Sequence, residues 1–175
     1  SISKYWISKY NWKKFENKIN SFKNYKTKVE DINLHFIFEK SKNPNSRPLL
    51  LLHGWPGSIS EFLNIIPRLA HPEKYGGKIK DGFDVIVPSL PGFGFSSQIK
   101  KALGPRKIGK ILNKFMVKNL GYKNYFVQGG DWGATIAGWI GLDSSKNCKG
   151  IHINCLPLRH PKGPKNSKEK KWEKK

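Results

Sequence analysis

Short apolar runs alternate with stretches of helical periodicity along the chain from residue 49 onward. Strands are expected at 49–52, 85–87, 124–128 and 150–153, and helices at 58–69, 106–119 and 132–142. The run Leu49–Leu52 is apolar at every position, which is typical of a strand buried on both faces. The alternation predicts an α/β fold with a mostly parallel sheet, right-handed crossovers and helices on its faces.

The chain before residue 49 follows other patterns. Its first 22 residues are predicted to form one amphipathic helix, because large apolar side chains recur at helical steps: Ile2, Tyr5, Trp12, Phe15, Ile19 and Phe22. Such an aromatic helix is expected to be an arm packed on the core, although its flanking lysines leave open a helix lying on a membrane surface. Two extended stretches follow, at Lys26–Val29 and Leu34–Phe38. At the other end, the stretch 159–175 shows no apolar periodicity and is expected to be mobile.

The composition is that of one globular domain with an unusually basic surface. The 175 residues are 37% hydrophobic and carry a net charge of +21. Only four of the 33 basic residues are arginine, and the lysines are spread along the whole chain. Proteins that recognise specific nucleic-acid sequences rely on the planar guanidinium group of arginine. Because arginine is scarce here, no specific nucleic-acid partner is expected. A basic nucleic-acid binder remains a rival interpretation.

The sequence also bears on location. No apolar stretch reaches the roughly 20 residues that a membrane span needs, and the N-terminus lacks a signal-peptide pattern. Cys148 and Cys155 are expected to form neither a disulfide nor a zinc site, because they lie too far apart in an extended segment and have no ligand-type spacing. A cytoplasmic location is therefore expected. Membrane association stays open, since the chain begins at Ser1 rather than at a methionine.

The stretch QGGDWGA (128–134) places an aspartate between glycines, directly after an expected strand and before an expected helix. This is the arrangement G-x-nucleophile-x-G of a nucleophile elbow, in which small neighbours allow a sharp turn that lifts the central side chain above the sheet. The helix that starts at Trp132 points its positive end at Asp131 and favours an ionised carboxylate. The alternative is that Asp131 merely caps that helix.

A second stretch, LLHGWPGS (51–58), ends the buried strand 49–52 with His53-Gly54-Trp55-Pro56-Gly57. In α/β-hydrolases the loop after this strand supplies one N–H of an oxyanion hole, and the residue after the nucleophile supplies the other. Here those donors would be the backbone amides of Trp55 and Trp132. The ring of His53 is expected to support the loop rather than to act as a base.

With PSLPGFGFS (88–96) between them, these two motifs resemble the epoxide hydrolases of the microsomal type, an α/β-hydrolase group that includes juvenile-hormone epoxide hydrolases. HGWPG together with QGGDWG is specific to this group. The resemblance covers nearly the whole chain in order. It implies an N-terminal helical arm at 1–24, an incomplete α/β-hydrolase core at 25–158 and the start of a truncated cap at 159–175.

The resemblance also implies a chemistry in which Asp131 is the nucleophile, the amides of Trp55 and Trp132 are the oxyanion donors, and no cofactor or metal takes part. A serine that attacked an epoxide carbon would be left as an ether, which water does not cleave at neutral pH. A carboxylate leaves an ester, which water hydrolyses to release a vicinal diol. The partners implied are a small epoxide and water.

The acid and base of the triad are not recognisable after Asp131. The carboxylates that follow are Asp143, Glu169 and Glu173, and the imidazoles are His152 and His160. In the group that the chain resembles, the acid and base lie far downstream, after a cap. We therefore expect a truncated chain that carries the nucleophile half of the site. A haloalkane dehalogenase-like hydrolase and a non-catalytic remnant are the nearest rivals.

Overall fold

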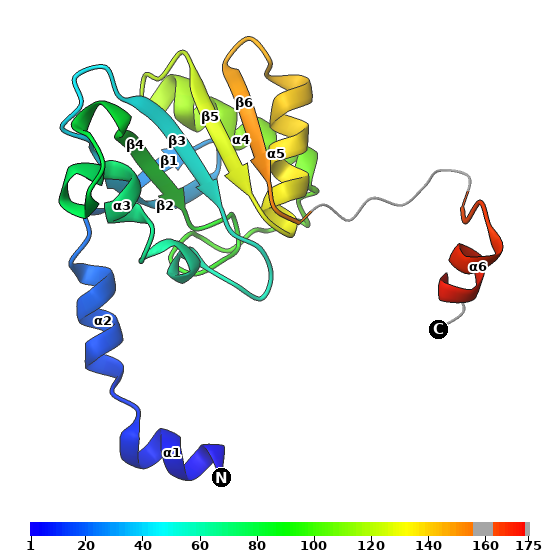
Figure 1. Cartoon of the computed structure of the whole chain (residues 1–175), viewed down its shortest axis with the longest axis horizontal. Coiled ribbons are helices and arrows are strands. Elements are labelled where there is room, and N and C mark those ends of the chain that lie inside the picture. Colours follow the sequence, from blue (N-terminus) through cyan, green and yellow to red (C-terminus); the bar gives the residue numbers. More distant parts are fainter. Residues whose placement is uncertain (156–162, 174–175) are drawn as a thin grey trace.

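The computed structural model describes residues 1–155 and 163–173. Its centre is a six-stranded sheet in the order β1-β2-β4-β3-β5-β6 (Figure 1). The strands are β1 (Asn24–Val29), β2 (Ile32–Glu39), β3 (Arg47–Leu52), β4 (Phe83–Pro88), β5 (Tyr125–Gly129) and β6 (Cys148–Ile153). Strands β3 to β6 run parallel, as predicted, whereas β1 and β2 form an antiparallel edge. The expected α/β fold class is confirmed.

Helices cover the two faces of the sheet unequally. On one face, α4 (Pro105–Lys114), its continuation as a π-helix at Phe115–Asn119, and α5 (Trp132–Asp143) bury the larger apolar cluster. On the other face, a 3-10 turn η1 (Ile59–Phe62) and the short helix α3 (Ile66–Ala70) pack on β3 and β4. Two further 3-10 turns, η2 (Pro72–Tyr75) and η3 (Ile79–Asp81), lead into β4.

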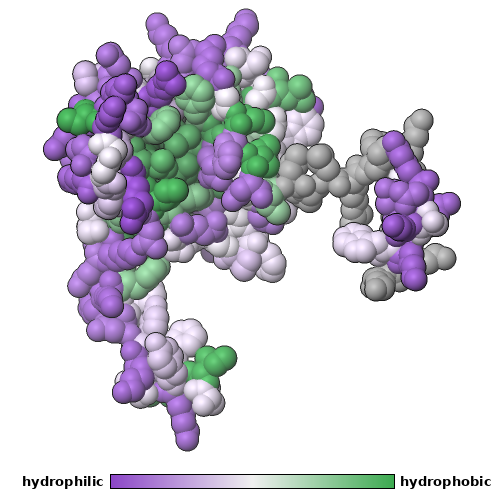
Figure 2. Space-filling view, in the orientation of Figure 1, coloured by the Kyte–Doolittle hydropathy of each residue, from purple (hydrophilic) through white to green (hydrophobic). Residues whose placement is uncertain are grey.

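The second face is only partly covered. Figure 2 shows hydrophobic residues exposed near the centre of the view, over the strands. The side chain of Ile151 in β6 is 45% exposed, and β6 pairs only with β5 within the described part of the chain. The strand expected at 150–153 is therefore present, and it forms an edge of the sheet in the described chain.

The N-terminal arm differs from the single helix predicted for residues 1–22. It forms two helices, α1 (Ile2–Lys9) and α2 (Trp12–Asn20), because Asn11 starts a new helix by accepting a hydrogen bond from the Lys14 amide at 3.1 Å. Only the second helix and the short turn after it pack on the core, through Phe15, Ile19 and Phe22. The predicted packing of Ile2, Tyr5 and Trp12 is wrong: their side chains are exposed.

Two other predicted elements need correction. The single helix expected over 58–69 is broken between η1 and α3, because Pro67 has no N–H to donate to the carbonyl of Leu63. The C-terminal stretch contains a helix, α6 (Ser167–Glu173), despite its lack of apolar periodicity. Local capping begins this helix: the Glu169 amide donates to Asn166 Oδ1 at 2.9 Å, and Glu169 Oε2 accepts from the Lys165 amide at 2.6 Å. Residues 156–162 and 174–175 of the predicted mobile tail and core boundary lie outside the described residues.

A buried histidine joins the arm to the sheet. The side-chain amide of Asn24 donates to the carbonyls of Ile19 and Phe22, at the end of α2, so its oxygen faces His35. His35 Nε2 then donates to Asn24 Oδ1 at 3.0 Å, and Ser89 Oγ donates to His35 Nδ1 at 2.9 Å. This network accommodates the neutral imidazole with its proton on Nε2. Burial, with a smaller effect from the charge of Lys26, lowers the pKa of His35 to about 4.

The stability of the fold should therefore depend on pH through His35. Above its ordinary pKa of 6.5 the ring is neutral in both the folded and the unfolded chain. As the pH falls from 6.5 towards 4, the unfolded chain binds the proton first, so the free energy of unfolding decreases. Between pH 7.5 and 5, protonation of His35 in the unfolded chain should lower the free energy of unfolding by roughly 2 kcal/mol. Urea unfolding of the wild type and His35→Gln at both pH values checks this, and an equal loss in the two proteins would contradict it.

Candidate active site

The turn between β5 and α5 has the geometry of a strained elbow. Strand β5 ends at Gly129 and α5 begins at Trp132. Asp131 adopts φ 51° and ψ −121°, and it is one of two non-glycine residues with positive φ among the described residues. Such a backbone conformation costs about 1–3 kcal/mol and persists only where the surroundings impose it. The Asp131 carboxylate makes no capping hydrogen bond to α5, so the simpler interpretation as a helix cap fails.

The carboxylate is instead bound by the loop that follows β3. The backbone amide of Trp55 donates to Asp131 Oδ1 at 2.9 Å. The sheet register explains the contact: β3 and β5 are parallel neighbours with Leu52 opposite Gly129, so both loops leave the sheet at one edge. Among the hydrogen bonds of the described residues, none joins the Trp132 amide to this carboxylate. Trp132 nevertheless begins α5 directly beside Asp131.

The buried ring of His53 contacts the same loop. The ring is fully buried, with Nδ1 3.1 Å from the Gly54 carbonyl oxygen and Nε2 accepting from the Leu90 amide at 3.0 Å. Burial lowers the pKa of His53, which favours the neutral ring that this pair of contacts requires. Because both nitrogens are engaged, His53 supports the loop, as the sequence predicted.

The elbow and the loop after β3 approach so closely that two positions of the motifs must be glycine. A Cβ on Gly54 would lie 2.5 Å from the Cβ of Asp131. A Cβ on Gly133 would lie 2.7 Å from the backbone carbon of Leu52 and 2.9 Å from the carbonyl oxygen of His53. All three separations are shorter than van der Waals contact allows, so any side chain at either position would push the elbow and the Trp55 loop apart.

Two exposed tryptophans neighbour the carboxylate: Trp55 donates its amide to it, and Trp132 follows it in the chain. Their exposed fractions are 68% and 45%. Phe95 is also exposed, but its ring packs against that of His35 at 5.0 Å. Phe93 is half-buried, and its ring meets that of His53 edge-on at 5.3 Å. An apolar rim around an ionisable group suits an uncharged organic ligand.

The candidate acids and bases that follow Asp131 do not join it. Asp143 lies at the far end of α5, where both its oxygens accept hydrogen bonds from Arg106, at 2.7 and 2.9 Å. His152 is level with Gln128 in the β5–β6 register, before the elbow, and no hydrogen bond connects it to Asp131 in the described chain. Glu169 caps α6. His160 lies outside the described residues, and Glu173 ends α6.

The structure adds one residue, Glu61, which the sequence places only near the start of the helix expected over 58–69. Glu61, in η1, lies beside the loop of residues 54–58 and within the electrostatic influence of Asp131. The spacing Ser58-x-x-Glu61 identified the cap, but nothing in it indicated a neighbour 70 residues away along the chain.

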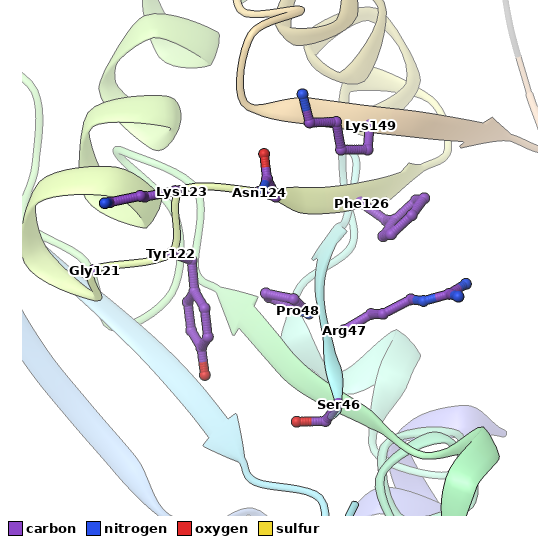
Figure 3. A pocket seen from close by; sticks show the side chains of 9 residues that line it. All are labelled: Ser46, Arg47, Pro48, Gly121, Tyr122, Lys123, Asn124, Phe126 and Lys149. Atoms are coloured by element: carbon purple, nitrogen blue, oxygen red, sulfur yellow. The ribbon is translucent and has the colours of Figure 1, made fainter. Parts of the chain in front are cut away.

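A depression at the opposite edge of the sheet does not gather its charged side chains. A shallow depression of about 570 Å³ lies at the amino ends of β3, β5 and β6, the edge opposite Asp131. The side chains of Arg47 and Lys123 point away from each other there, so they do not converge on a ligand (Figure 3). Within residues 1–155 and 163–173, no group of three or more histidine, cysteine, aspartate or glutamate side chains is arranged to bind a metal ion.

Comparison with known families decides where this architecture belongs. The family model described as "alpha/beta hydrolase fold" matches residues 47–173, which is most of the chain. The chain belongs to the α/β-hydrolase fold family. A second model, "Epoxide hydrolase N terminus", matches residues 1–62 of this α/β hydrolase and includes the helical arm and the HGWPG loop.

Similar proteins are epoxide hydrolases. The α/β hydrolase is 42% identical over 161 residues to a putative epoxide hydrolase of Stigmatella aurantiaca and 40% identical over 165 residues to epoxide hydrolase 1 of Oryctolagus cuniculus. Both alignments cover 91% of this chain and 36% of the relative. The chain thus spans about a third of the length of these relatives.

Solved structures agree. The juvenile hormone epoxide hydrolase of the silkworm Bombyx mori superposes with a TM-score of 0.79 at 36% identity, over 91% of this chain and 38% of that one. The epoxide hydrolase of Aspergillus niger superposes with a TM-score of 0.78 at 32% identity, over 96% and 44%. The predicted resemblance to epoxide hydrolases is confirmed.

Replacement of Gly54 should disrupt the contact between the two loops. In Gly54→Ala the new methyl group collides with the Asp131 side chain, so we expect a loss of roughly 1–3 kcal/mol in the free energy of unfolding. The Trp55 amide resonance in a ¹⁵N-correlated NMR spectrum should also shift. Gly138→Ala in α5 is the matched control, because a Cβ there meets nothing within 4 Å and alanine favours a helix. Equal stability of the two variants would contradict the close approach.

Proposed function

We propose that Asp131 is the nucleophile of an epoxide hydrolase and that the amides of Trp55 and Trp132 are its oxyanion donors. The observation that carries the proposal is the position of the Asp131 carboxylate and its hydrogen bond. It stands at a positive-φ elbow, makes no helix-capping bond, and has Oδ1 bound by the Trp55 amide at 2.9 Å. A side chain that served only to cap α5 would turn towards the helix amides instead.

The geometry suits a two-step reaction. With Oδ1 bound to the Trp55 amide, Oδ2 is the oxygen that attacks an epoxide carbon from the side opposite the ring oxygen. The new C–O bond forms an aspartyl ester while the ring C–O bond breaks, and the released alkoxide takes up a proton. Water then adds to the ester carbonyl, whose oxygen is stabilised by the loop amides, and the diol leaves as the carboxylate is restored.

The substrate class follows from the surroundings of Asp131. The exposed side chains of Trp55 and Trp132 beside it are aromatic and uncharged, so we propose an apolar epoxide, with water as the second reactant. The reaction proposed needs no cofactor or metal, and no nucleic-acid partner is proposed. Cys148 and Cys155 are free thiols, which supports a reducing location such as the cytoplasm. No helix within the described residues has the length and apolar character needed to cross a membrane.

Covalent labelling tests the nucleophile. On incubation of the full chain with styrene oxide, we expect an ester adduct on Asp131, identified by peptide mass spectrometry. The amide of Asp131→Asn is a far weaker nucleophile, so labelling at this position should fall by a factor on the order of 100 or more. The experiment is best done in Cys155→Ser, because the exposed Cys155 thiol also reacts with epoxides.

Glu16→Gln, an exposed carboxylate of α2, is the matched control and should label like the parent. Labelling spread over exposed carboxylates with no preference for position 131 would favour a non-catalytic chain. Faster labelling of Asp131 by a primary alkyl bromide than by the epoxide would favour the dehalogenase-like alternative.

A further inference from the structure

Glu61 occupies a place that the proposed reaction does not yet use. It follows the loop of residues 54–58, which carries the Trp55 amide, and forms part of the 3-10 turn η1. The turn is closed by two local bonds: the Ser60 amide donates to Ser58 Oγ at 3.2 Å, and the Glu61 amide donates to the Ser58 carbonyl at 3.2 Å. These bonds direct the Glu61 side chain back towards the loop.

The carboxylate of Glu61 fills the inside of this loop. A Cβ on Gly57 would lie 2.7 Å from Glu61 Cδ and would also overlap its Oε1. Gly57 is therefore needed so that the carboxylate can lie against the loop backbone. The arrangement resembles a capping box extended by several residues, in which a glutamate reaches back to backbone amides that precede its helix.

The surroundings of the Glu61 carboxyl shift its pKa. Burial raises the pKa of the Glu61 carboxyl, hydrogen bonding from the Gly54 and Ser58 backbones lowers it, and the negative charge of Asp131 raises it. The pKa of this one carboxyl thus depends on both ends of the loop and on Asp131. His53 contacts the same loop at the Gly54 carbonyl from the buried side.

We propose that Glu61 is a positioning residue, whose carboxylate binds the backbone of Gly54 and Ser58 and thereby keeps the Trp55 amide directed at Asp131 Oδ1. Trp55 lies in the loop of residues 54–58, against which the Glu61 carboxylate packs at Gly57, so loss of the carboxylate would free the Trp55 amide to rotate. The structural part of this inference stands on the loop geometry alone. Its consequence for the reaction rests on the function proposed above.

A ¹⁵N-correlated NMR titration of the full chain tests the structural part. The Gly54 and Ser58 amides should shift with a common midpoint above 4.5, the ordinary pKa of a glutamate carboxyl. In Glu61→Gln this titration should vanish, while the Trp55 amide keeps its wild-type shift because the side-chain carbonyl still accepts a hydrogen bond. In Asp131→Asn the midpoint should move to lower pH, because the neighbouring charge is gone. Glu16→Gln should change none of these signals.

The rate of styrene oxide labelling at Asp131 tests the consequence. Glu61→Ala should slow labelling by roughly tenfold, since a small misplacement of reacting groups has effects of this size or larger. Glu61→Gln should label Asp131 at a rate within about threefold of the parent, because the glutamine side chain still accepts hydrogen bonds from the loop. Loop amides that do not follow Glu61, or equal labelling in the alanine variant and the parent, would overturn the proposal. A chain in which the amides titrate as expected but Asp131 labels in no variant would instead refute the proposed function and leave the loop assignment intact.

Discussion

The hydrogen bond from the Trp55 amide to Asp131 Oδ1 joins two loops that are far apart in the sequence, and the geometry of the site depends on it. It forms because β3 and β5 are adjacent, parallel and in a register that ends both strands at the same level. Gly54 and Gly133 then allow the two backbones to approach more closely than side chains would permit. The sheet supplies the alignment, and the glycines supply the space.

The sequence predicted those parts of the fold that are determined by local pattern. Apolar runs such as Leu49–Leu52 identified the buried parallel strands, and the glycine-flanked Asp131 identified the elbow. The predictions failed where a local feature outweighed the periodicity. Asn11 and Pro67 interrupt helices whose apolar spacing continues across the break, and a polar capping sequence around Asn166 begins a helix that has no apolar face. Side-chain capping and missing amides are single-residue effects, which a periodic pattern does not register.

Other features of the site could not be read from the sequence because they require the three-dimensional neighbours. The spacing of Ser58 and Glu61 indicates only a helix start, whereas the carboxylate also lies against a loop opposite Asp131. Likewise, the exposure of Trp55 and Trp132 depends on which elements cover the carboxyl edge of the sheet. The proposed second donor, the Trp132 amide, makes no hydrogen bond to the carboxylate within the described chain, so its role would begin only when charge develops on an ester oxygen.

The backbone strain at Asp131 must be offset by contacts with residues that are distant in the sequence. A positive φ at a non-glycine residue costs about 1–3 kcal/mol, and a hydrogen bond to a charged group contributes about 1.5–3 kcal/mol. The two quantities are similar, so the Trp55 amide offsets much of the strain that lifts the carboxylate above the sheet. An isolated QGGDWGA segment would have no such compensation and would be expected to relax. The elbow is therefore a property of the paired strands β3 and β5 rather than of its own sequence. The proposed nucleophile adopts its reactive geometry only once the loop that contacts His53 is in place.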